Sequence, residues 1–226
     1  VPELAKLPMD SLWYSFHQNL DYEKIIEECK NAKEIGLETV IIDDGWQTDD
    51  NNRGYAFCGD WEVCERKMVD MKKLVNEIHR LGMKVMLWYS VPFMGIHSKN
   101  FHEFKTMLLD DSGDNETFFS LDPRYKKVRE YLSKLYESAV KEWDLDGLKL
   151  DFIDRFVLRG KSLEADERRD YESLEDAIHC LLSEIKENLT KLKSDVLIEF
   201  RQSYVGPSIR KYGNMLRVMD CPNDAI

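Results

Sequence analysis

The 226-residue chain lacks any apolar run close to the ~18–20 residues that a membrane-spanning helix needs. Residues 1–10 also lack the basic segment and following apolar stretch that mark a secretory signal. Positive charge is scarce, since 32 Lys and Arg residues stand against 43 Asp and Glu residues, and the net charge is −11. This charge repels phosphodiester backbones. The sequence therefore predicts no membrane partner and no nucleic-acid partner.

Paired cysteines are lacking too. The chain has five cysteines, an odd number, and none of them forms a CxxC motif. Such a pattern predicts neither a disulfide framework nor a zinc site. The five histidines show no metal-ligand spacing. We therefore expect reduced thiols, a cytoplasmic protein and no bound metal. The cysteines are Cys29, Cys58, Cys64, Cys180 and Cys221.

Short apolar runs alternate with longer amphipathic stretches, a pattern typical of parallel strands joined by crossover helices. Between the first five runs, apolar residues recur at the spacing of a helical face. Gly36 and Gly82 are placed where a helix ends and a strand begins, and Asp122 before Pro123 predicts a helix that starts near Arg124. The runs that predict strands are 11–16, 38–43, 83–90, 146–153, 196–203 and 215–220.

These elements predict an α/β fold of the (β/α)₈ TIM-barrel type, with six parallel strands in sequential order and a helix after each strand except the last. A complete barrel has about 250 residues and eight strands. We therefore expect a barrel truncated to about six βα units. No Pro- or Ser-rich linker divides the chain. Residues 1–226 are expected to form one catalytic domain that is incomplete at its C-terminus.

Polar and aromatic residues occur in the last positions of the apolar runs, where parallel α/β sheets collect their functional groups. We expect the side chains that the strands carry there to line one cavity. The residues concerned are Asp43, Asp44, Trp46, Trp88, Tyr89, Lys149, Asp151, Glu199, Arg201 and Asp220.

Asp151 stands in the apolar run GLKLDFI, where a carboxylate is costly to bury without a partner. Lys149 lies two residues earlier and therefore on the same face of the strand, where its ammonium group would keep Asp151 ionised. An ionised carboxylate held in place is the nucleophile of covalent glycosyl transfer. A structural Lys–Asp pair explains the spacing equally well, so the spacing alone leaves both interpretations open.

The adjacent carboxylates Asp43 and Asp44 have three interpretations: metal chelation, capping of the following turn, and hydrogen bonding to sugar hydroxyls. Sugar binding fits better than a metal, because histidine ligands with suitable spacing are lacking. Trp46 and Trp88 would offer flat faces to a pyranose ring. Burial in the core is the alternative for each tryptophan.

Five motifs, in their order along the chain, carry a family resemblance: IIDDGWQ (41–47), GDWEV (59–63), GMKVMLWYSVPF (82–93), GLKLDFID (147–154) and RVMD (217–220). Together they resemble the catalytic barrel of family 36 glycoside hydrolases, the α-galactosidases and raffinose-synthase-like enzymes. DDGW followed later by KxD is more specific than either motif alone.

The resemblance implies a retaining α-galactosidase that works by double displacement without a cofactor. It implies that Asp151 is the nucleophile and Asp220 the general acid/base. The chain departs from the family in two places. It has KLDFID where the commonest member has KWD followed by Asn-Arg, and MDCPNDAI where a Ser-Asp-Asp or Ser-Asp-Asn run is usual. The second departure makes Asp224 a rival for the acid/base role.

The resemblance also implies a galactoside or oligosaccharide substrate, an N-terminal β-sandwich and a C-terminal β-domain outside these residues. It leaves the oligomeric state open, with a homo-oligomer as one option. Two alternative functions remain: α-galactosyl transfer of the raffinose-synthase type, and a non-catalytic carbohydrate-binding barrel. The implied substrate-binding residues are Trp13, Tyr14, Asp43, Asp44, Trp88, Lys149 and Arg201.

Overall fold

The computed structural model describes residues 1–109, 116–201 and 206–217, apart from the side chain of Lys161. Six strands form one sheet in the order β1-β2-β3-β6-β7-β8, and every neighbouring pair is parallel. The predicted set of six sequential parallel strands is confirmed. The strands are β1 (Met9–Ser11), β2 (Thr39–Ile42), β3 (Lys84–Ser90), β6 (Gly147–Asp151), β7 (Leu197–Arg201) and β8 (Met215–Arg217).

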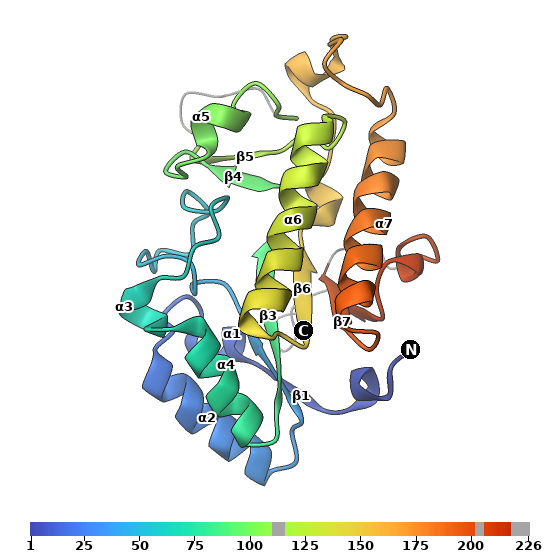
Figure 1. Ribbon diagram of the computed structural model, residues 1–226. Coiled ribbons are helices and arrows are strands. Elements are labelled where there is room, and N and C mark those ends of the chain that lie inside the picture. The colour runs from blue at the N-terminus through green and yellow to red at the C-terminus, as the bar shows by residue number, and fades with distance from the viewer. Residues whose placement is uncertain (110–115, 202–205, 218–226) are drawn as a thin grey trace, which may run out of the picture.

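Two further strands, β4 (Phe93–Gly95) and β5 (Phe118–Ser120), lie outside this sheet. They pair with each other in an antiparallel ribbon within the long connection that follows β3 (Figure 1). The described residues therefore contain eight strands instead of the expected six. No antiparallel pairing occurs among the six strands of the main sheet.

Four long helices connect the strands, as the apolar stripes predicted, and in Figure 1 α2 lies beside α4 and α6 beside α7. Aspartate and serine side chains accept a backbone N–H at the start of three of them: Asp21 for α2, Asp70 for α4 and Ser173 for α7. None of the helices in the described ranges is both long and apolar enough to cross a membrane. The four are α2 (Tyr22–Glu34), α4 (Met71–Arg80), α6 (Lys126–Trp143) and α7 (Leu174–Leu192).

The turns after α2 and α4 need positive φ, and glycine supplies it. Gly36 has φ +90° and Gly82 has φ +78°, which confirms the predicted helix ends. The remaining helices are short. They are η1 (Glu3–Lys6), α1 (Leu12–Phe16), α3 (Glu65–Met68), α5 (Phe101–Phe104), η2 (Ile153–Arg155), η3 (Gly160–Leu163) and η4 (Ile209–Lys211).

Two predicted boundaries near helices are wrong. The run 11–16 was expected to be a strand, but β1 ends at Ser11 and residues 12–16 form α1; a short apolar run fits a helix and a strand equally well. Asp122 does not cap the next helix, since α6 begins at Lys126. Its fully buried carboxylate instead pairs with Arg124 at 2.8 Å and Arg169 at 3.1 Å.

The connection between β7 and β8 also differs from the prediction. Its described part holds only the 3-10 helix η4, where we expected an α-helix. No apolar stripe of helical spacing exists in residues 204–214, which is the physical reason. Residues 218–220, the last part of the sixth predicted strand, lie outside the described residues.

The two faces of the sheet carry different side chains because successive residues of a strand point to opposite sides. Val40, Ile42, Val85 and Leu87 belong to the main hydrophobic core, which includes the residues of the long helices. On the opposite face, a small separate cluster forms around Ile41, Met86 and Leu197. This second face carries the candidate site.

Candidate active site

The second face of the sheet changes from apolar to polar towards the strand C-termini. Moving two residues along a strand from the apolar cluster leads from Ile41 to Asp43, from Met86 to Trp88 and from Leu197 to Glu199. Parallel register places residues of neighbouring strands side by side: Trp88 is next to Lys149, which is next to Glu199. The next row pairs Ser90 with Asp151 and Asp151 with Arg201.

A pocket of about 190 Å³ lies at this end of the strands. Seven of its ten lining residues are candidates from the sequence. Four described candidates are not among the lining residues: Tyr14, Trp46, Tyr89 and Glu199. Asp220 and its rival Asp224 lie outside the described residues. The lining residues are Trp13, Asp43, Asp44, Arg53, Tyr55, Trp88, Lys149, Asp151, Phe152 and Arg201.

Lys149 forms its direct ion pair with Asp43, while its charge also favours the ionised form of Asp151, as the shared strand face predicted. Its Nζ donates to Oδ2 of Asp43 at 2.7 Å, and both side chains are 3% exposed. Burial opposes the charge on Lys149, but the attraction of Asp43 and Asp151 outweighs it and raises the pKa of the lysine. Lys149 is therefore positively charged at neutral pH, and it acts on Asp151 by electrostatic attraction without a direct hydrogen bond.

Asp151 has two direct hydrogen-bond donors. Trp88 Nε1 donates to its Oδ2 at 3.0 Å, and the backbone N–H of Phe152 donates to its Oδ1 at 2.8 Å. Arg201 lies 4.0 Å from Oδ1. Burial raises the pKa of Asp151 to about 6, although Lys149, Trp88 and Arg201 each favour the ionised form. The carboxylate is therefore charged at neutral pH but lies close to its titration point.

Asp44 is the second perturbed carboxylate of the pocket. Gln18 Nε2 donates to its Oδ2 at 2.8 Å, and Gln47 Nε2 donates to its Oδ1 at 2.8 Å. Burial raises the pKa of Asp44 to about 6, and the two amide hydrogen bonds partly oppose this shift. Each oxygen retains a lone pair that a hydroxyl group can use.

The two tryptophans have different roles. Trp88 lines the pocket, while Trp46 is fully buried and donates from Nε1 to the backbone oxygen of Trp88 at 2.8 Å. Stacking on a sugar and burial in the core were both open for each tryptophan, and Trp46 is buried in the core. Trp61 packs edge-on against Trp88, with ring centroids 5.8 Å apart. Trp46 and Trp61 therefore hold the indole that binds Asp151.

Tyr14 lies away from the pocket lining, beside Arg217 at the edge of the sheet. Arg217 pairs with the buried Glu199 at 3.0 Å. Burial opposes the charge of Arg217, but Glu199 and a hydrogen bond with Tyr14 outweigh it and raise the pKa of the arginine. The expected role of Tyr14 in lining the sugar pocket thus finds no support in this placement.

Arg53, Tyr55 and Phe152 line the pocket but were missed from the sequence. Phe152 has φ +64°, a backbone conformation that the strand pattern does not predict. Its position directly after Asp151 was the only sign in the sequence that it lies at the pocket. Arg53 and Tyr55 belong to the loop after β2, where no periodic pattern predicts direction. Within the described ranges, no three His, Cys, Asp or Glu side chains gather to hold a metal ion.

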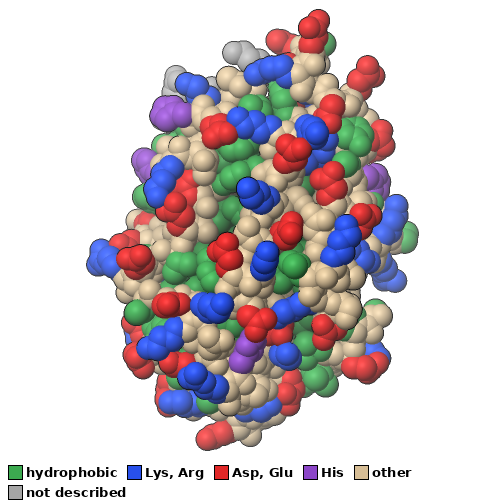
Figure 2. All heavy atoms as spheres, viewed as in Figure 1, with side chains coloured by type: hydrophobic (Ala, Val, Ile, Leu, Met, Phe, Trp, Pro, Cys, Tyr) green, Lys and Arg blue, Asp and Glu red, His purple; other side chains and the backbone are tan. Residues whose placement is uncertain are grey.

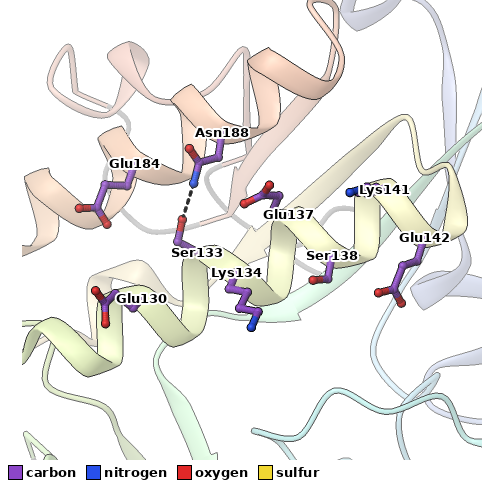
Figure 3. A pocket seen from close by; sticks show the side chains of 9 residues that line it. All are labelled: Glu130, Ser133, Lys134, Glu137, Ser138, Lys141, Glu142, Glu184 and Asn188. Carbon is purple, nitrogen blue, oxygen red and sulfur yellow. Dashed lines mark hydrogen bonds between the residues drawn. The ribbon is translucent and has the colours of Figure 1, made fainter.

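Another hollow lies on the helical side of the molecule. A groove of about 600 Å³ lies between α6 and α7. Figure 3 shows the side chains that line it, and among them Asn188 donates to Ser133 at 3.1 Å. Acidic and basic side chains are interspersed over this face (Figure 2). The groove is larger than the strand-end pocket but lies between two helices, away from the strand C-termini where parallel α/β folds collect their catalytic groups, so we do not assign the chemistry to it.

The chain is similar to several known proteins. A family model, Melibiase, matches residues 9–219. Alpha-galactosidase Mel36A of Lactobacillus acidophilus is 27% identical over 148 residues, which cover 62% of this chain and 19% of that protein. Alpha-galactosidase AgaA of Geobacillus stearothermophilus is 34% identical over 79 residues, 34% of this chain and 10% of that protein.

The solved structures show the same fold. A crystal structure of a variant of GH36 alpha-galactosidase AgaA from Geobacillus stearothermophilus, in complex with raffinose, matches with a TM-score of 0.78 at 20% identity. It covers 93% of this chain and 30% of that chain, so this chain spans less than a third of each of these relatives. The six parallel strands are those of a truncated (β/α)₈ barrel. The resemblance to family 36 glycoside hydrolases is confirmed, and the chain belongs to the Melibiase family.

Proposed function

We propose that the protein that carries this chain hydrolyses terminal α-galactosides with retention of configuration. One observation carries the proposal: Asp151, a buried carboxylate at the end of β6, accepts hydrogen bonds from Trp88 and the backbone of Phe152 in a pocket lined by charged and aromatic side chains. The relatives support the choice of substrate, since they are named alpha-galactosidases and the solved structures include complexes with raffinose and stachyose.

In the proposed reaction, Asp151 attacks the anomeric carbon while protonated Asp220 donates a proton to the leaving oxygen. The product of this step is a β-linked galactosyl ester of Asp151. Asp220, now ionised, then removes a proton from water, which attacks the anomeric carbon and releases Asp151. Two inversions give net retention, and the two carboxyl groups are sufficient for the chemistry.

The pocket supports these roles electrostatically. Asp151 must be ionised to attack, and Lys149, Trp88 and Arg201 all favour its ionised form. Asp43 and Asp44 would accept hydrogen bonds from galactose hydroxyls distal to the scissile bond. Lys149 also pairs with Asp43 at 2.7 Å, so this buried carboxylate has a counter-charge.

The pKa shifts predict the acid limb of the activity profile. Asp151 and Asp44 both have a pKa of about 6, and both must be ionised to act as nucleophile and as acceptor. On the acid side of the profile, we expect log(kcat/KM) to fall below pH ~6 with a limiting slope between one and two per pH unit. Steady-state rates between pH 4 and pH 8 measure this. An acid limb centred near pH 4 would contradict the prediction.

The substrate assignment is tested on the complete protein with p-nitrophenyl α-galactoside, α-glucoside and α-N-acetylgalactosaminide. We expect the galactoside to have the highest kcat/KM, and proton NMR to detect α-galactose as the first product. β-Galactose as first product, or preference for another glycoside, would overturn the proposal. Incubation of raffinose, and of a galactosyl donor with sucrose, distinguishes hydrolysis from transfer to a sugar hydroxyl.

We also infer that residues 1–226 act as one catalytic domain in a cytoplasmic protein. The first inference is supported by the single six-stranded sheet, whose strand ends carry the pocket. The second is supported by the thiols in the described residues, which are all free. Those thiols belong to Cys29, Cys58, Cys64 and Cys180.

A further inference from the structure

Gln18, which follows α1, contacts two residues of the pocket with one side chain. Its Nε2 donates to Oδ2 of Asp44 at 2.8 Å, and its Oε1 accepts from the backbone N–H of Arg53 at 2.5 Å. Nε2 also lies 3.3 Å from the backbone oxygen of Gly54. The side chain is 1% exposed, so water cannot replace these hydrogen bonds.

Lys67 of α3 holds the backbone of Gln18 in place. Its Nζ donates to the backbone oxygens of Gln18 at 2.7 Å and Gly45 at 3.1 Å, and to Oδ1 of Asn51 at 2.7 Å. An ammonium group has three N–H donors, and three neutral oxygens from two loops use them all. Burial lowers the pKa of Lys67, and its position joins the loops after β1 and β2.

The backbones of these loops touch directly. Gly45 has φ +111°, and a Cβ atom at this position would lie 2.5 Å from both Cα and the backbone oxygen of Gln18. No larger residue fits without moving one of the loops. Gln18 is therefore held at a fixed position relative to Asp44, the residue before Gly45.

We propose that Gln18 is a positioning residue for substrate binding, anchored by Lys67: it orients the carboxylate of Asp44 and holds the loop that carries Arg53. The proposal rests on the proposed function, in which Asp44 binds sugar hydroxyls. Gln18 occupies one lone pair of Asp44 Oδ2 and so directs the remaining ones. It also sets the backbone of Arg53, whose guanidinium lies over the ring of Trp13 at 5.1 Å.

The charge of Asp44 provides a second way to detect this role. Gln18 donates a hydrogen bond to the ionised carboxylate and thereby opposes the burial that raises its pKa to about 6. Removal of this donor should raise the pKa of Asp44 further. The titratable groups that act electrostatically with Asp44 are Asp43, Tyr55, Cys58 and Lys67.

The kinetic test uses Gln18→Met in the complete protein, because methionine has a similar shape and no amide. We expect KM for p-nitrophenyl α-galactoside to rise at least ~10-fold while kcat changes less than ~3-fold, since the lost contact acts in both the ground state and the transition state. Lys67→Met should shift KM in the same direction. Asn188→Leu, which removes an amide hydrogen bond far from the pocket, is the matched control and should leave KM unchanged.

Gln18→Glu separates the two contacts of the side chain. It keeps an acceptor for Arg53 but places a carboxylate against Asp44, so its KM relative to wild type should be highest above pH ~7 and should decrease towards pH ~5, where one carboxyl becomes protonated. Unchanged KM in folded Gln18→Met and Gln18→Glu variants, or a loss confined to kcat, would overturn the proposal.

Carbon-13 NMR titration of Asp44 distinguishes failure of this inference from failure of the proposed function. We expect a higher pKa of Asp44 in Gln18→Met than in wild type, and no change in Asn188→Leu. This readout requires no substrate. An inactive wild type with the expected titration shift would reject the proposed function alone, whereas an active wild type with an unchanged pKa of Asp44 in Gln18→Met would reject the positioning role.

Discussion

Replacement of Asp151 by Asn in the complete protein is expected to lower kcat/KM for α-galactosides by roughly 10⁴-fold or more, because the amide has nearly the same shape but cannot form the glycosyl ester. Steady-state kinetics with p-nitrophenyl α-galactoside measures the loss. The size of the effect separates a nucleophile from a binding residue, since loss of a single hydrogen bond to a charged group costs only ~10- to 100-fold.

The same substitution is expected to stabilise the fold, and this provides its control. Burial raises the pKa of Asp151 from an ordinary value of 3.8 to about 6, so the folded state binds a proton more tightly than the unfolded state. The charged carboxylate therefore destabilises the fold above pH ~6, by about 3 kcal/mol, and this cost disappears as the pH falls from ~6 to below ~4.

Asp151→Asn should accordingly be more stable to urea than wild type at pH 7 and equal to it near pH 4. A variant that is inactive but more stable cannot owe its inactivity to misfolding. A less stable variant at pH 7 would contradict the electrostatic description of the pocket.

Azide rescue assigns the two carboxyl roles. An Asp220→Gly variant still forms the β-linked intermediate, so azide should attack it from the α face and yield α-galactosyl azide. An Asp151→Gly variant forms no intermediate, so azide should displace the leaving group directly and yield β-galactosyl azide. The opposite pairing of variant and product would show that the roles are exchanged. Rescue to the α-azide in Asp224 variants alone would move the acid/base role to Asp224.

Replacement of Lys149 by Met is expected to destabilise the protein by about 3–5 kcal/mol, the usual cost of leaving one partner of a buried ion pair without its counter-charge. Asp43 would lose a partner at 2.7 Å in a site where both side chains are 3% exposed. Urea unfolding at pH 7 measures the change. Activity should fall as well, because loss of the cation raises the pKa of Asp151 further.

Two further variants make the Lys149 result specific. Lys126→Met removes an exposed lysine 3.4 Å from Glu130 and should change stability by ~1 kcal/mol or less. The double variant of Lys149→Met with Asp43→Asn should recover much of the lost stability, because no unpaired carboxylate then remains at position 43. Additive losses in the double variant would show that the pair is not energetically coupled.

Much of this architecture could be predicted from local pattern. Apolar runs and helical stripes predicted six parallel strands and four crossover helices because burial requires a period of two in strands and 3.6 in helices. The same alternation placed Lys149 and Asp151 on one face of β6, and seven of the predicted residues line the pocket. A pattern with a short period therefore determines to which face of its own helix or strand each side chain points.

Contacts between elements depended on the tertiary structure. Lys149 binds Asp43, 106 residues away in the sequence, because the parallel register brings the ends of β2, β3 and β6 together. Gln18 and Arg53 belong to loops with no periodic pattern, so only the folded chain showed that one amide serves both Arg53 and Asp44. The sequence by itself determined which side chains of a strand share a face. Packing of distant segments decided which of those side chains share a charge or a hydrogen bond, because these energies depend on distances between segments that local periodicity does not contain.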